Sequence, residues 1–576
     1  MDYMERYKQW CEDGYYDESA KKELLRLQGQ ECEIEERFYK ELDFGTGGLR
    51  GIMGAGTNRM NIYTVRKATQ GLANYIIAEK ASEKGVVIAY DSRNHSAEFA
   101  REAALCLAAN GIKAYVFDSL RPTPELSFAV RELKCVAGIV ITASHNPPEY
   151  NGYKVYWGDG AQITAPIDGE IIRQIRLITD VSMIKTLSKE IAISNQLYIS
   201  IGESLDEKFL SAIIRLTLCP EVIRQAADRL KIVYTPLHGS GGMLVQKGLT
   251  ELGYKQVYAV KEQEQPDGDF PTIKSPNPEE EEAFTLALQL AKEVNADIIL
   301  ATDPDADRLG LYAKDKTTGK YIRFTGNMTG ILMAEYILRN KKEKGTIPAV
   351  GSIVTTIVTT KMADAVTREY KVNLAETLTG FKYIGEQIRL FEQEGDQEFI
   401  FGFEESCGYL TGTYARDKDA VGAAIMLCEI AAFCKVQNRT LWDEMVRLYQ
   451  KYGYFREELC TITLNGQEGN EKIKAIMSTL RTEKPNSFGN FAVLEVYDYK
   501  NGEVIFQKTG NKQNLDYPKS NVMYFKLSND SWCCVRPSGT EPKIKIYMGV
   551  KGHSLDDSEK KLDELRESVM DSMQTE

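Results

Sequence analysis

Residues 296–308 read ADIILATDPDADR, an apolar run of strand length that passes directly into three aspartates. Two other stretches share this plan: the run at 137–142 leads into Ala-Ser-His-Asn-Pro at 143–147, and the run at 397–401 leads into Gly-Phe-Glu-Glu-Ser at 402–406. In parallel α/β sheets, ligands collect at the polar loops that follow the strands. The three strand exits indicate tandem α/β units, and their wide spacing favours separate domains over a solenoid.

Apolar runs alternate with helix-like stretches over most of the chain. The run Val86–Tyr90 precedes residues 96–110, which are rich in Ala, Glu and Leu. Further runs stand at 114–117, 231–234 and 350–356. Apolar runs of strand length that are separated by helices predict largely parallel α/β sheets.

The pattern changes near Lys451. Short runs with Gly or Asn in the connections predict an antiparallel sheet, and they stand at 491–499, 503–506, 522–527 and 531–535. A final helix is expected over 554–573, where apolar residues recur at three- and four-residue spacing. The first forty residues read as polar helix, and we expect them to wrap on the first domain.

The composition is that of a globular protein. The 576 residues carry a formal net charge of −12, with 43% hydrophobic and 27% charged residues, which excludes a disordered chain. A duplex-binding protein would have a basic excess, so no nucleic-acid partner is expected, whereas a small anionic substrate needs only a local cluster of Arg and Lys. Eleven scattered cysteines without a Cys-x-x-Cys pair favour reduced thiols over disulfides or zinc, and four histidines argue against a histidine-rich metal centre.

The sequence predicts neither a secretory signal nor a membrane-spanning segment. Residues 1–6 are charged and lack the apolar core of a secretory signal. The longest apolar stretch, near 421–434, is interrupted by Glu429 and is too short to cross a bilayer. We therefore expect a soluble, cytoplasmic protein without a membrane partner.

The aspartates at 303, 305 and 307 are the most informative cluster. If the extended geometry of the strand continues, these alternate carboxylates project to one side, where they repel one another unless a cation lies between them. Oxygen ligands favour Mg²⁺, which also bridges to phosphate. An EF-hand is excluded because Arg308 and Lys314 occupy the positions of its Gly and Glu. A solvated acidic turn is the alternative, and it is less attractive for three aspartates after a buried-type strand.

Ser144 follows a second strand, in a loop that reads Thr-Ala-Ser-His-Asn-Pro at 142–147. It is either a turn residue or a nucleophile exposed at the ligand-binding edge of the sheet. The lack of a Gly-x-Ser-x-Gly elbow weakens a hydrolase interpretation. His145 is a candidate base for Ser144, although side chains of adjacent residues rarely face each other.

Two further loops are rich in groups that bind anions. Residues 536–543 read Arg-Pro-Ser-Gly-Thr-Glu-Pro-Lys, and their guanidinium, two hydroxyls and glycine N–H suit a phosphate dianion, although a plain surface turn remains the alternative. Residues 44–51 are Gly-rich and include Arg50, but their spacing fails the dinucleotide-binding pattern. No P-loop string occurs either.

Taken together and in this order, the motifs resemble those of the α-D-phosphohexomutase family, and most closely its phosphoglucomutases. Residues 142–147 are similar to its phosphoserine loop, 303–308 to its magnesium loop, 379–382 and 402–406 to its sugar-recognition loops, and 536–540 to its phosphate-binding loop. The resemblance implies three tandem related α/β domains with mixed, mostly parallel sheets and a C-terminal α+β domain, around a central active-site cleft. The expected boundaries are 1–208, 209–320, 321–450 and 451–576.

The resemblance also implies the reaction, a reversible transfer of a phosphoryl group between O1 and O6 of glucose phosphate through phosphorylated Ser144 and a glucose 1,6-bisphosphate intermediate, which also acts as activator. One Mg²⁺ per active site would be held by Asp303, Asp305, Asp307 and the phosphoserine. Arg50, Lys154 and Arg308 would lie near the reacting phosphate, with Lys154 as candidate proton-transfer group and His145 beside Ser144. The remaining implied residues bind substrate: Thr379, Gly380, Lys382, Glu404 and Ser406 at the sugar, and Arg536, Ser538, Gly539 and Thr540 at the non-reacting phosphate.

Two positions depart from the family pattern. Phe403 stands where phosphoglucomutases often have Gly, and Phe381 stands where relatives carry His or Trp. Both positions lie in the loops that resemble the sugar-recognition loops of the family, so phosphomannomutase and phosphopentomutase activities remain alternatives. From other classes, a metal-dependent phosphatase and an inactive sugar-phosphate sensor also remain open. The expected partners are small sugar phosphates, and the expected assembly is a monomer or homodimer.

Overall fold

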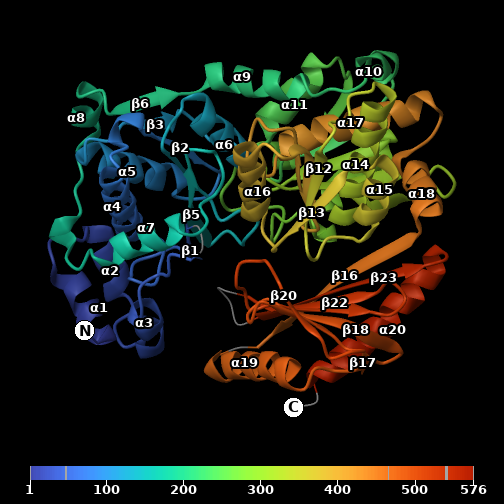
Figure 1. The fold of residues 1–576 in the computed structure, drawn as a ribbon. Helices are drawn as coiled ribbons and strands as arrows, with labels where there is room; N and C mark the ends of the chain where they lie inside the picture. The colour runs from blue at the N-terminus through green and yellow to red at the C-terminus, as the bar shows by residue number, and fades with distance from the viewer. Residues whose placement is uncertain (1, 46–47, 465, 539–542, 575–576) are drawn as a thin grey trace. The chain divides into compact units, whose positions relative to one another are not determined.

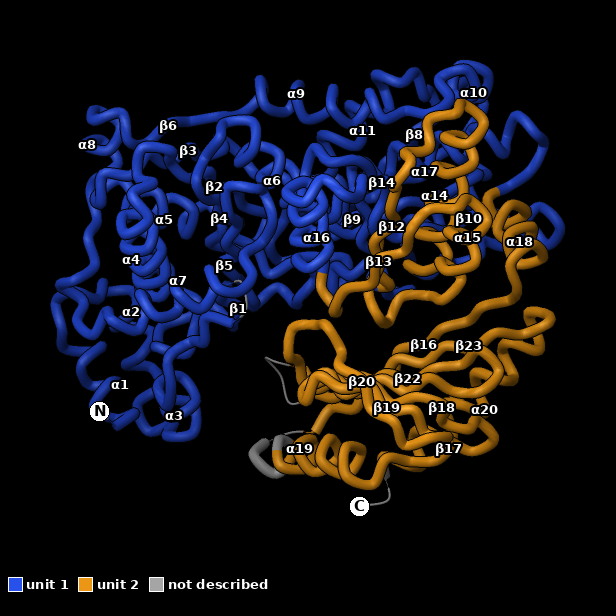
Figure 2. Tube along the Cα trace, in the orientation of Figure 1, with its two compact units in different colours: residues 1–325, 381–402, 406–440 blue, residues 326–380, 403–405, 441–576 orange. Residues whose placement is uncertain are grey.

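The computed structural model describes residues 2–45, 48–464, 466–538 and 543–574. It has four sheets in chain order, and the chain divides into two compact units (Figures 1 and 2). Unit 1 contains residues 1–325, 381–402 and 406–440, and unit 2 contains residues 326–380, 403–405 and 441–576. The expected class, three mixed α/β sheets followed by a β-rich C-terminal part, is confirmed.

The first sheet has the strand order β1-β5-β4-β2-β3-β6. Strands β2, β3, β4 and β6 form parallel pairs, and β5 is antiparallel to both of its neighbours, β4 and the edge strand β1. Its strands are β1 (Gly48–Ile52), β2 (Val86–Tyr90), β3 (Ala114–Phe117), β4 (Ala137–Ile141), β5 (Tyr150–Trp157) and β6 (Tyr198–Ile201). Its helices are α4 (Ile62–Ala78), η1 (Ser82–Lys84), α5 (Ser96–Ala109), α6 (Thr123–Glu132), α7 (Ile167–Arg176), η2 (Val181–Met183), α8 (Lys189–Ser194) and α9 (Glu203–Ile214).

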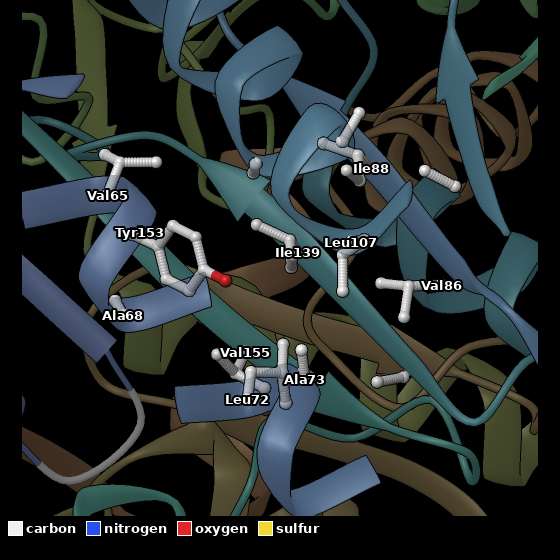
Figure 3. Packing of buried hydrophobic residues seen from close by; sticks show 14 of the residues in the cluster. Val65, Ala68, Leu72, Ala73, Val86, Ile88, Leu107, Ile139, Tyr153 and Val155 are labelled. Atoms are coloured by element: carbon white, nitrogen blue, oxygen red, sulfur yellow. The ribbon is translucent and has the colours of Figure 1, made fainter. Parts of the chain in front are cut away.

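The inner strands β2, β3 and β4 are apolar throughout because both of their faces are covered. Side chains alternate between the faces of a strand. Val86 and Ile88 of β2 accordingly enter a core with α4 and α5, whereas Val87 and Ala89 enter a second core with α6. Figure 3 shows the first core, in which Tyr153 of β5 packs among aliphatic side chains. The continuous apolar runs in the sequence are therefore the signature of a doubly covered sheet.

The second sheet, order β11-β10-β9-β7-β8, carries the aspartate loop. Strand β7 is parallel to β8 and β9, and β10 is antiparallel to β9. The elements are α10 (Pro220–Ala226), β7 (Lys231–Thr235), α11 (Gly242–Glu251), β8 (Gln256–Ala259), α12 (Lys261–Glu264), η3 (Glu281–Phe284), α13 (Thr285–Val294), β9 (Ile298–Thr302), β10 (Leu309–Lys314) and β11 (Tyr321–Phe324).

The third sheet has the order β13-β12-β14-β15. Its elements are α14 (Gly326–Glu343), β12 (Gly351–Thr356), α15 (Met362–Tyr370), β13 (Asn373–Thr377), α16 (Phe381–Glu394), β14 (Glu398–Glu404), β15 (Gly408–Thr411), α17 (Ala420–Val436) and α18 (Leu441–Tyr452). Helix α17 contains the longest apolar stretch and is almost entirely buried. Among the described residues no single helix is long and apolar enough to cross a membrane, and only α17 and α18 taken together, as a bent pair, reach that length and composition.

The last sheet has eight strands, and its described pairs are antiparallel, as the connections in the sequence predict. Its elements are β16 (Tyr454–Thr463), α19 (Gly466–Thr482), β17 (Ser487–Phe488), β18 (Phe491–Asp498), β19 (Glu503–Phe506), β20 (Lys512–Asn514), β21 (Met523–Leu527), β22 (Trp532–Pro537), β23 (Lys543–Gly552) and α20 (Leu555–Gln574). The expected final helix is α20, which buries Leu565, Val569 and Met573 in this sheet's core.

The N-terminal segment is more than a polar helix. It forms α1 (Tyr3–Glu12), α2 (Glu18–Leu25) and α3 (Glu31–Phe38), whose aromatic side chains make a buried cluster with Tyr63 of α4. Trp10 stacks on Tyr16 with ring centroids 4.1 Å apart, and Tyr63 donates a hydrogen bond to Asp17 at 2.9 Å. The segment therefore packs on the first α/β domain, as expected, through a core of its own.

Candidate active site

Ser144 lies in the loop after β4, which the sequence identified as a candidate site. Its backbone adopts a left-handed conformation (φ 52°), and its N–H donates to Thr142 Oγ1 at 2.7 Å. The Ser144 hydroxyl donates to Asp303 Oδ2 at 2.8 Å and lies 3.2 Å from His145 Nδ1. The expectation that adjacent side chains rarely face each other is wrong here, because the left-handed backbone turns Ser144 toward its neighbour.

The neutral form of His145 is favoured in this environment. Burial, and then the guanidinium groups of Arg308 and Arg50, hold the pKa of the imidazole well below its usual range. A neutral ring can accept a hydrogen bond from Ser144, but the single hydroxyl proton makes its shorter contact with Asp303.

Arg93 fixes the shape of the Ser144 loop. Its Nη2 donates to the carbonyl oxygen of Ser144 at 2.6 Å and to that of Asn146, and its Nη1 donates to those of Pro147 at 2.8 Å and Tyr150 at 3.0 Å. The guanidinium lies 3.4 Å from Asp91 and is fully buried. One planar group with fixed donors thus binds four loop carbonyls, which a flexible ammonium could not do.

The three aspartates converge through a turn. Strand β9 ends at Thr302, and Ala306 is left-handed (φ 49°), so the extended geometry considered as a condition does not continue, although the three carboxylates do converge. Asp303 Oδ1 accepts the N–H groups of Asp307 and Arg308, both at 3.0 Å, which closes the turn. One oxygen from each of the three buried aspartates lies within 4.8 Å of the others.

Two lysines reach this cluster. Lys154 of β5 lies 2.9 Å from Asp305 Oδ2 and 3.3 Å from Asp307 Oδ2, and Lys418 lies 2.8 Å from Asp307 Oδ2. Burial opposes the charge on Lys154, but Asp305 and Asp307 outweigh it and raise the pKa of Lys154 above its usual range. A general base needs the opposite shift, so this arrangement favours the charged form of Lys154.

Burial and neighbouring charges also shift the pKa values of Asp303 and Asp305. Burial, together with the charges of Asp305 and Asp307, raises the pKa of Asp303 well above its usual range. Burial also raises the pKa of Asp305, but Lys154, a hydrogen bond with Asp303 and the charge of Lys418 together outweigh burial, so the pKa of that carboxyl is lowered.

The donor set fits a hard divalent cation. The Oδ1 atoms of Asp305 and Asp307 are buried and have no hydrogen-bond partner within the described part of the chain. A buried carboxylate oxygen without a partner is costly, and two of them beside a third carboxylate call for a cation. Oxygen-only ligands suit Mg²⁺.

Two arginines complete the group in unit 1. Arg50 of β1 donates to Asn146 Oδ1 at 3.3 Å, and pairing of β1 with β5 places Gly48 opposite Lys154. Arg308 follows the aspartates and pairs with Glu279. Unit 1 therefore brings together eight of the residues that the sequence singled out: Arg50, Ser144, His145, Lys154, Asp303, Asp305, Asp307 and Arg308.

The predicted substrate-binding residues are divided between the units. Lys382, over the ring of Tyr383 at 4.9 Å, and Ser406 belong to unit 1. The others belong to unit 2: Thr379, Gly380 (φ 119°), buried Glu404, Arg536 and Ser538. The N–H of Ser538 donates to Lys543 O at 2.7 Å, whereas Gly539 and Thr540 lie outside the described residues.

Sequence reasoning missed Lys418, Arg93 and Thr123. Thr123 begins α6 and donates through its Oγ1 to Asp305 Oδ2 at 3.0 Å. None of the three lies in a motif with recognisable spacing. A usable signal was Asp91-Ser92-Arg93 directly after the apolar run of β2, because it repeats the plan of the other polar strand exits.

Comparison with protein families gives three matches in tandem. Residues 41–181, 207–317 and 325–452 match domains I, II and III of the phosphoglucomutase/phosphomannomutase family, each described as an alpha/beta/alpha domain. A phosphoglucomutase of Staphylococcus aureus (strain MSSA476) is 38% identical over 539 residues, covering 92% of this chain and 94% of the relative. One of Staphylococcus haemolyticus is 35% identical over 517 residues, covering 90% and 91%.

Solved structures have the same fold. Parafusin of Paramecium, an exocytosis-sensitive phosphoprotein and phosphoglucomutase in an open form, superposes with a TM-score of 0.67 at 17% identity, covering 93% of this chain and 96% of its own. A phosphoglucomutase/phosphomannomutase family protein of Burkholderia thailandensis superposes with a TM-score of 0.64 at 19% identity, covering 92% and 98%. At such identities the likeness concerns the fold.

Proposed function

Because this chain belongs to the phosphoglucomutase/phosphomannomutase family, we propose that it is a phosphoglucomutase, an isomerase that interconverts α-D-glucose 1-phosphate and glucose 6-phosphate. The observation that carries the proposal is the 2.8 Å hydrogen bond from Ser144 Oγ to Asp303 Oδ2, inside the group of three aspartates. The phosphoglucomutase relatives at 35–38% identity support glucose as the sugar.

Ser144 is the proposed carrier of the phosphoryl group. As phosphoserine it would transfer that group to the free hydroxyl of a glucose monophosphate, which forms glucose 1,6-bisphosphate and leaves the Ser144 hydroxyl. Transfer of the other phosphate back to Ser144 Oγ, after the intermediate has turned over, would release the isomer. Arg93 holds the loop carbonyls during both transfers, so that Ser144 keeps its position.

Asp303, Asp305 and Asp307 would hold one Mg²⁺ together with an oxygen of the phosphoserine. When bound, the ion supplies positive charge to the transferring phosphoryl group. Lys154 and Lys418 keep two carboxylate oxygens oriented, and their ammonium groups can donate a proton or a hydrogen bond to an oxygen of the substrate. Arg50 and Arg308 supply further hydrogen-bond donors beside Ser144, and His145 in its neutral form adds no positive charge.

The remaining predicted residues are proposed to recognise the substrate. Thr379, Gly380, Lys382, Glu404 and Ser406 would bind the sugar hydroxyls, and Arg536, Ser538, Gly539 and Thr540 would bind the phosphate that does not react. We also propose the four-domain division at 1–208, 209–320, 321–450 and 451–576. Glucose 1,6-bisphosphate is the proposed activator, the cytoplasm the proposed location, and a monomer or homodimer the proposed assembly.

The proposal is tested by turnover of glucose 1-phosphate with Mg²⁺ and a trace of glucose 1,6-bisphosphate. Mannose, N-acetylglucosamine and ribose 1-phosphates run in parallel. We expect the glucose substrate to be fastest, with isomerisation rather than phosphate release, and intact mass to show one phosphate that is lost in Ser144→Ala. Faster turnover of another sugar would keep the chemistry and refute glucose. Net phosphate release would favour a phosphatase, and a phosphorylated but inactive protein would favour a sensor.

A further inference from the structure

Thr123 joins the first α/β domain to the aspartate loop of the second. It is the first residue of α6, and it is fully buried. Its backbone N–H donates to the carbonyl oxygen of Asp305 at 2.9 Å, and its Oγ1 donates to Asp305 Oδ2 at 3.0 Å. One residue therefore holds both the backbone and the carboxylate of Asp305, across 182 positions of sequence.

The hydroxyl of Thr123 bonds outside its own helix, because its described hydrogen bond goes to Asp305. The N-cap residue of α6 is Pro122, which forms no side-chain cap bond. The hydroxyl points to Asp305 instead, and the helix behind it is fixed, because Leu126, Ala129 and Val130 pack in the core of the first sheet. The donor is thus presented from a rigid element.

The bond decides which oxygen of Asp305 is left for a ligand. Oδ2 accepts from Thr123 at 3.0 Å and from Lys154 at 2.9 Å, so both donors lie on the same atom. Oδ1 is buried and has no hydrogen-bond partner within the described part of the chain. A carboxylate held by one oxygen in this way keeps the other oriented for a cation, as partners of metal ligands do in other proteins.

Ser240 and Ala420 also hold the loop, but they do so through its backbone. The N–H and hydroxyl of Ser240 both donate to Pro304 O at 2.8 Å, and the N–H of Ala420 donates to Ala306 O at 3.2 Å. These contacts fix the path of the loop and would persist without Thr123 Oγ1. The hydroxyl therefore acts on the side chain of Asp305 in addition to this backbone support.

We propose that Thr123 is a positioning residue for the divalent cation, acting through Asp305. The inference rests on the metal site of the proposed function. It requires that loss of the hydroxyl weakens cation binding while the loop keeps its path. Such outer partners of metal ligands typically contribute about 10–100-fold to metal affinity.

The test compares three variants by calorimetric titration of the full-length, dephosphorylated protein with Mg²⁺. Thr123→Val removes the hydroxyl and keeps the shape, and Thr123→Ser keeps the hydroxyl. Thr69→Val is the matched control, because Thr69 is also fully buried and its Oγ1 contacts Val65 O at 2.8 Å and Tyr153 Oη at 3.1 Å, away from the aspartates. Mn²⁺ binding followed by electron paramagnetic resonance gives a second readout that does not depend on turnover.

We expect Thr123→Val to bind Mg²⁺ about 10–100-fold more weakly than wild type, and Thr123→Ser to stay within about threefold. Thr69→Val should keep wild-type metal affinity even where its melting temperature falls. Wild-type affinity in Thr123→Val would overturn the inference and leave the proposed function standing. Equal weakening in Thr69→Val would also overturn it, because the effect would then reflect general destabilisation. A wild-type protein that binds no Mg²⁺ would overturn the proposed metal site and this inference with it.

Discussion

Replacing Arg93 by Lys should disable Ser144 while leaving the fold in place. The guanidinium donates to four carbonyl oxygens of the Ser144 loop and faces Asp91, and its side chain is fully buried. A lysine has three donors. If one of them stays with Asp91, two of the four carbonyls lose their partner.

The magnitude follows from those two lost bonds. Each buried acceptor without a partner costs about 1–3 kcal/mol, so the variant should lose about 2–6 kcal/mol of local stability around the loop. The apolar cores on both faces of the first sheet are untouched, so the domain should still fold. A catalytic group displaced by about 1 Å can cost about 100-fold in rate, so we expect kcat to fall by about two orders of magnitude.

The assay is steady-state isomerisation of glucose 1-phosphate, together with intact mass for Ser144 phosphate and thermal unfolding for the fold. Arg59→Lys is the control, because Arg59 is also buried and pairs with Glu33 at 3.3 Å in the N-terminal region. It should lose stability and keep its turnover within about threefold. Wild-type turnover in Arg93→Lys, or an equal loss of turnover in Arg59→Lys, would refute the reasoning.

Three further outcomes are expected. Burial raises the pKa of Asp419 to about 6 from the usual 3.8, so protonated Asp419 stabilises the native state below pH 3.8, and this stabilisation is lost as pH rises through 6. The free energy of unfolding of Asp419→Asn should therefore rise by about 2 kcal/mol relative to that of the wild type between pH 4 and pH 8. A difference that stays constant over this pH range would contradict the prediction. Gly71→Ala should destabilise by about 1–3 kcal/mol in thermal unfolding, because a Cβ there would lie 2.3 Å from Ile175 Cγ1, whereas Gly169→Ala, with open space around it, should be neutral or stabilising. Mg²⁺ at 100 times its Kd should stabilise the wild type by about 2.7 kcal/mol, and an equal effect on Asp307→Asn would exclude that residue as a ligand.

The fold was predictable where local pattern and tertiary environment agree. The run Val86–Tyr90 is apolar at every position because β2 has a core on each face, and such a short apolar run is typical of a buried strand. The N-terminal segment was less predictable. Trp10 and Phe38 lie on the short helices α1 and α3, Tyr16 lies in the turn between α1 and α2, and polar residues separate all three in the sequence. They form a core only because they pack together with Tyr63 of α4.

The candidate site was predictable to the extent that its residues follow strands. Ser144 and the three aspartates stand at the carboxyl ends of β4 and β9, so the sequence alone indicates that they face ligand. What holds them is harder to find in the sequence, because the supporting side chains come from other elements, and only Arg93 among them lies in a polar strand exit that gives a usable signal. Thr123 lies 182 positions from Asp305, and Arg93 lies 51 positions from Ser144.

The same contrast applies to the aspartate cluster, whose convergence was expected on the condition that the extended strand geometry continues. An extended strand would place Asp303, Asp305 and Asp307 on one side by alternation alone. The chain instead uses a turn with a left-handed Ala306, closed by two N–H bonds to Asp303 Oδ1. A turn can bring carboxylates closer than a strand does, but it has no ladder to hold it, so neighbouring segments must supply the bonds. The support by Thr123, Ser240 and Ala420 is therefore a physical consequence of building the site on a turn.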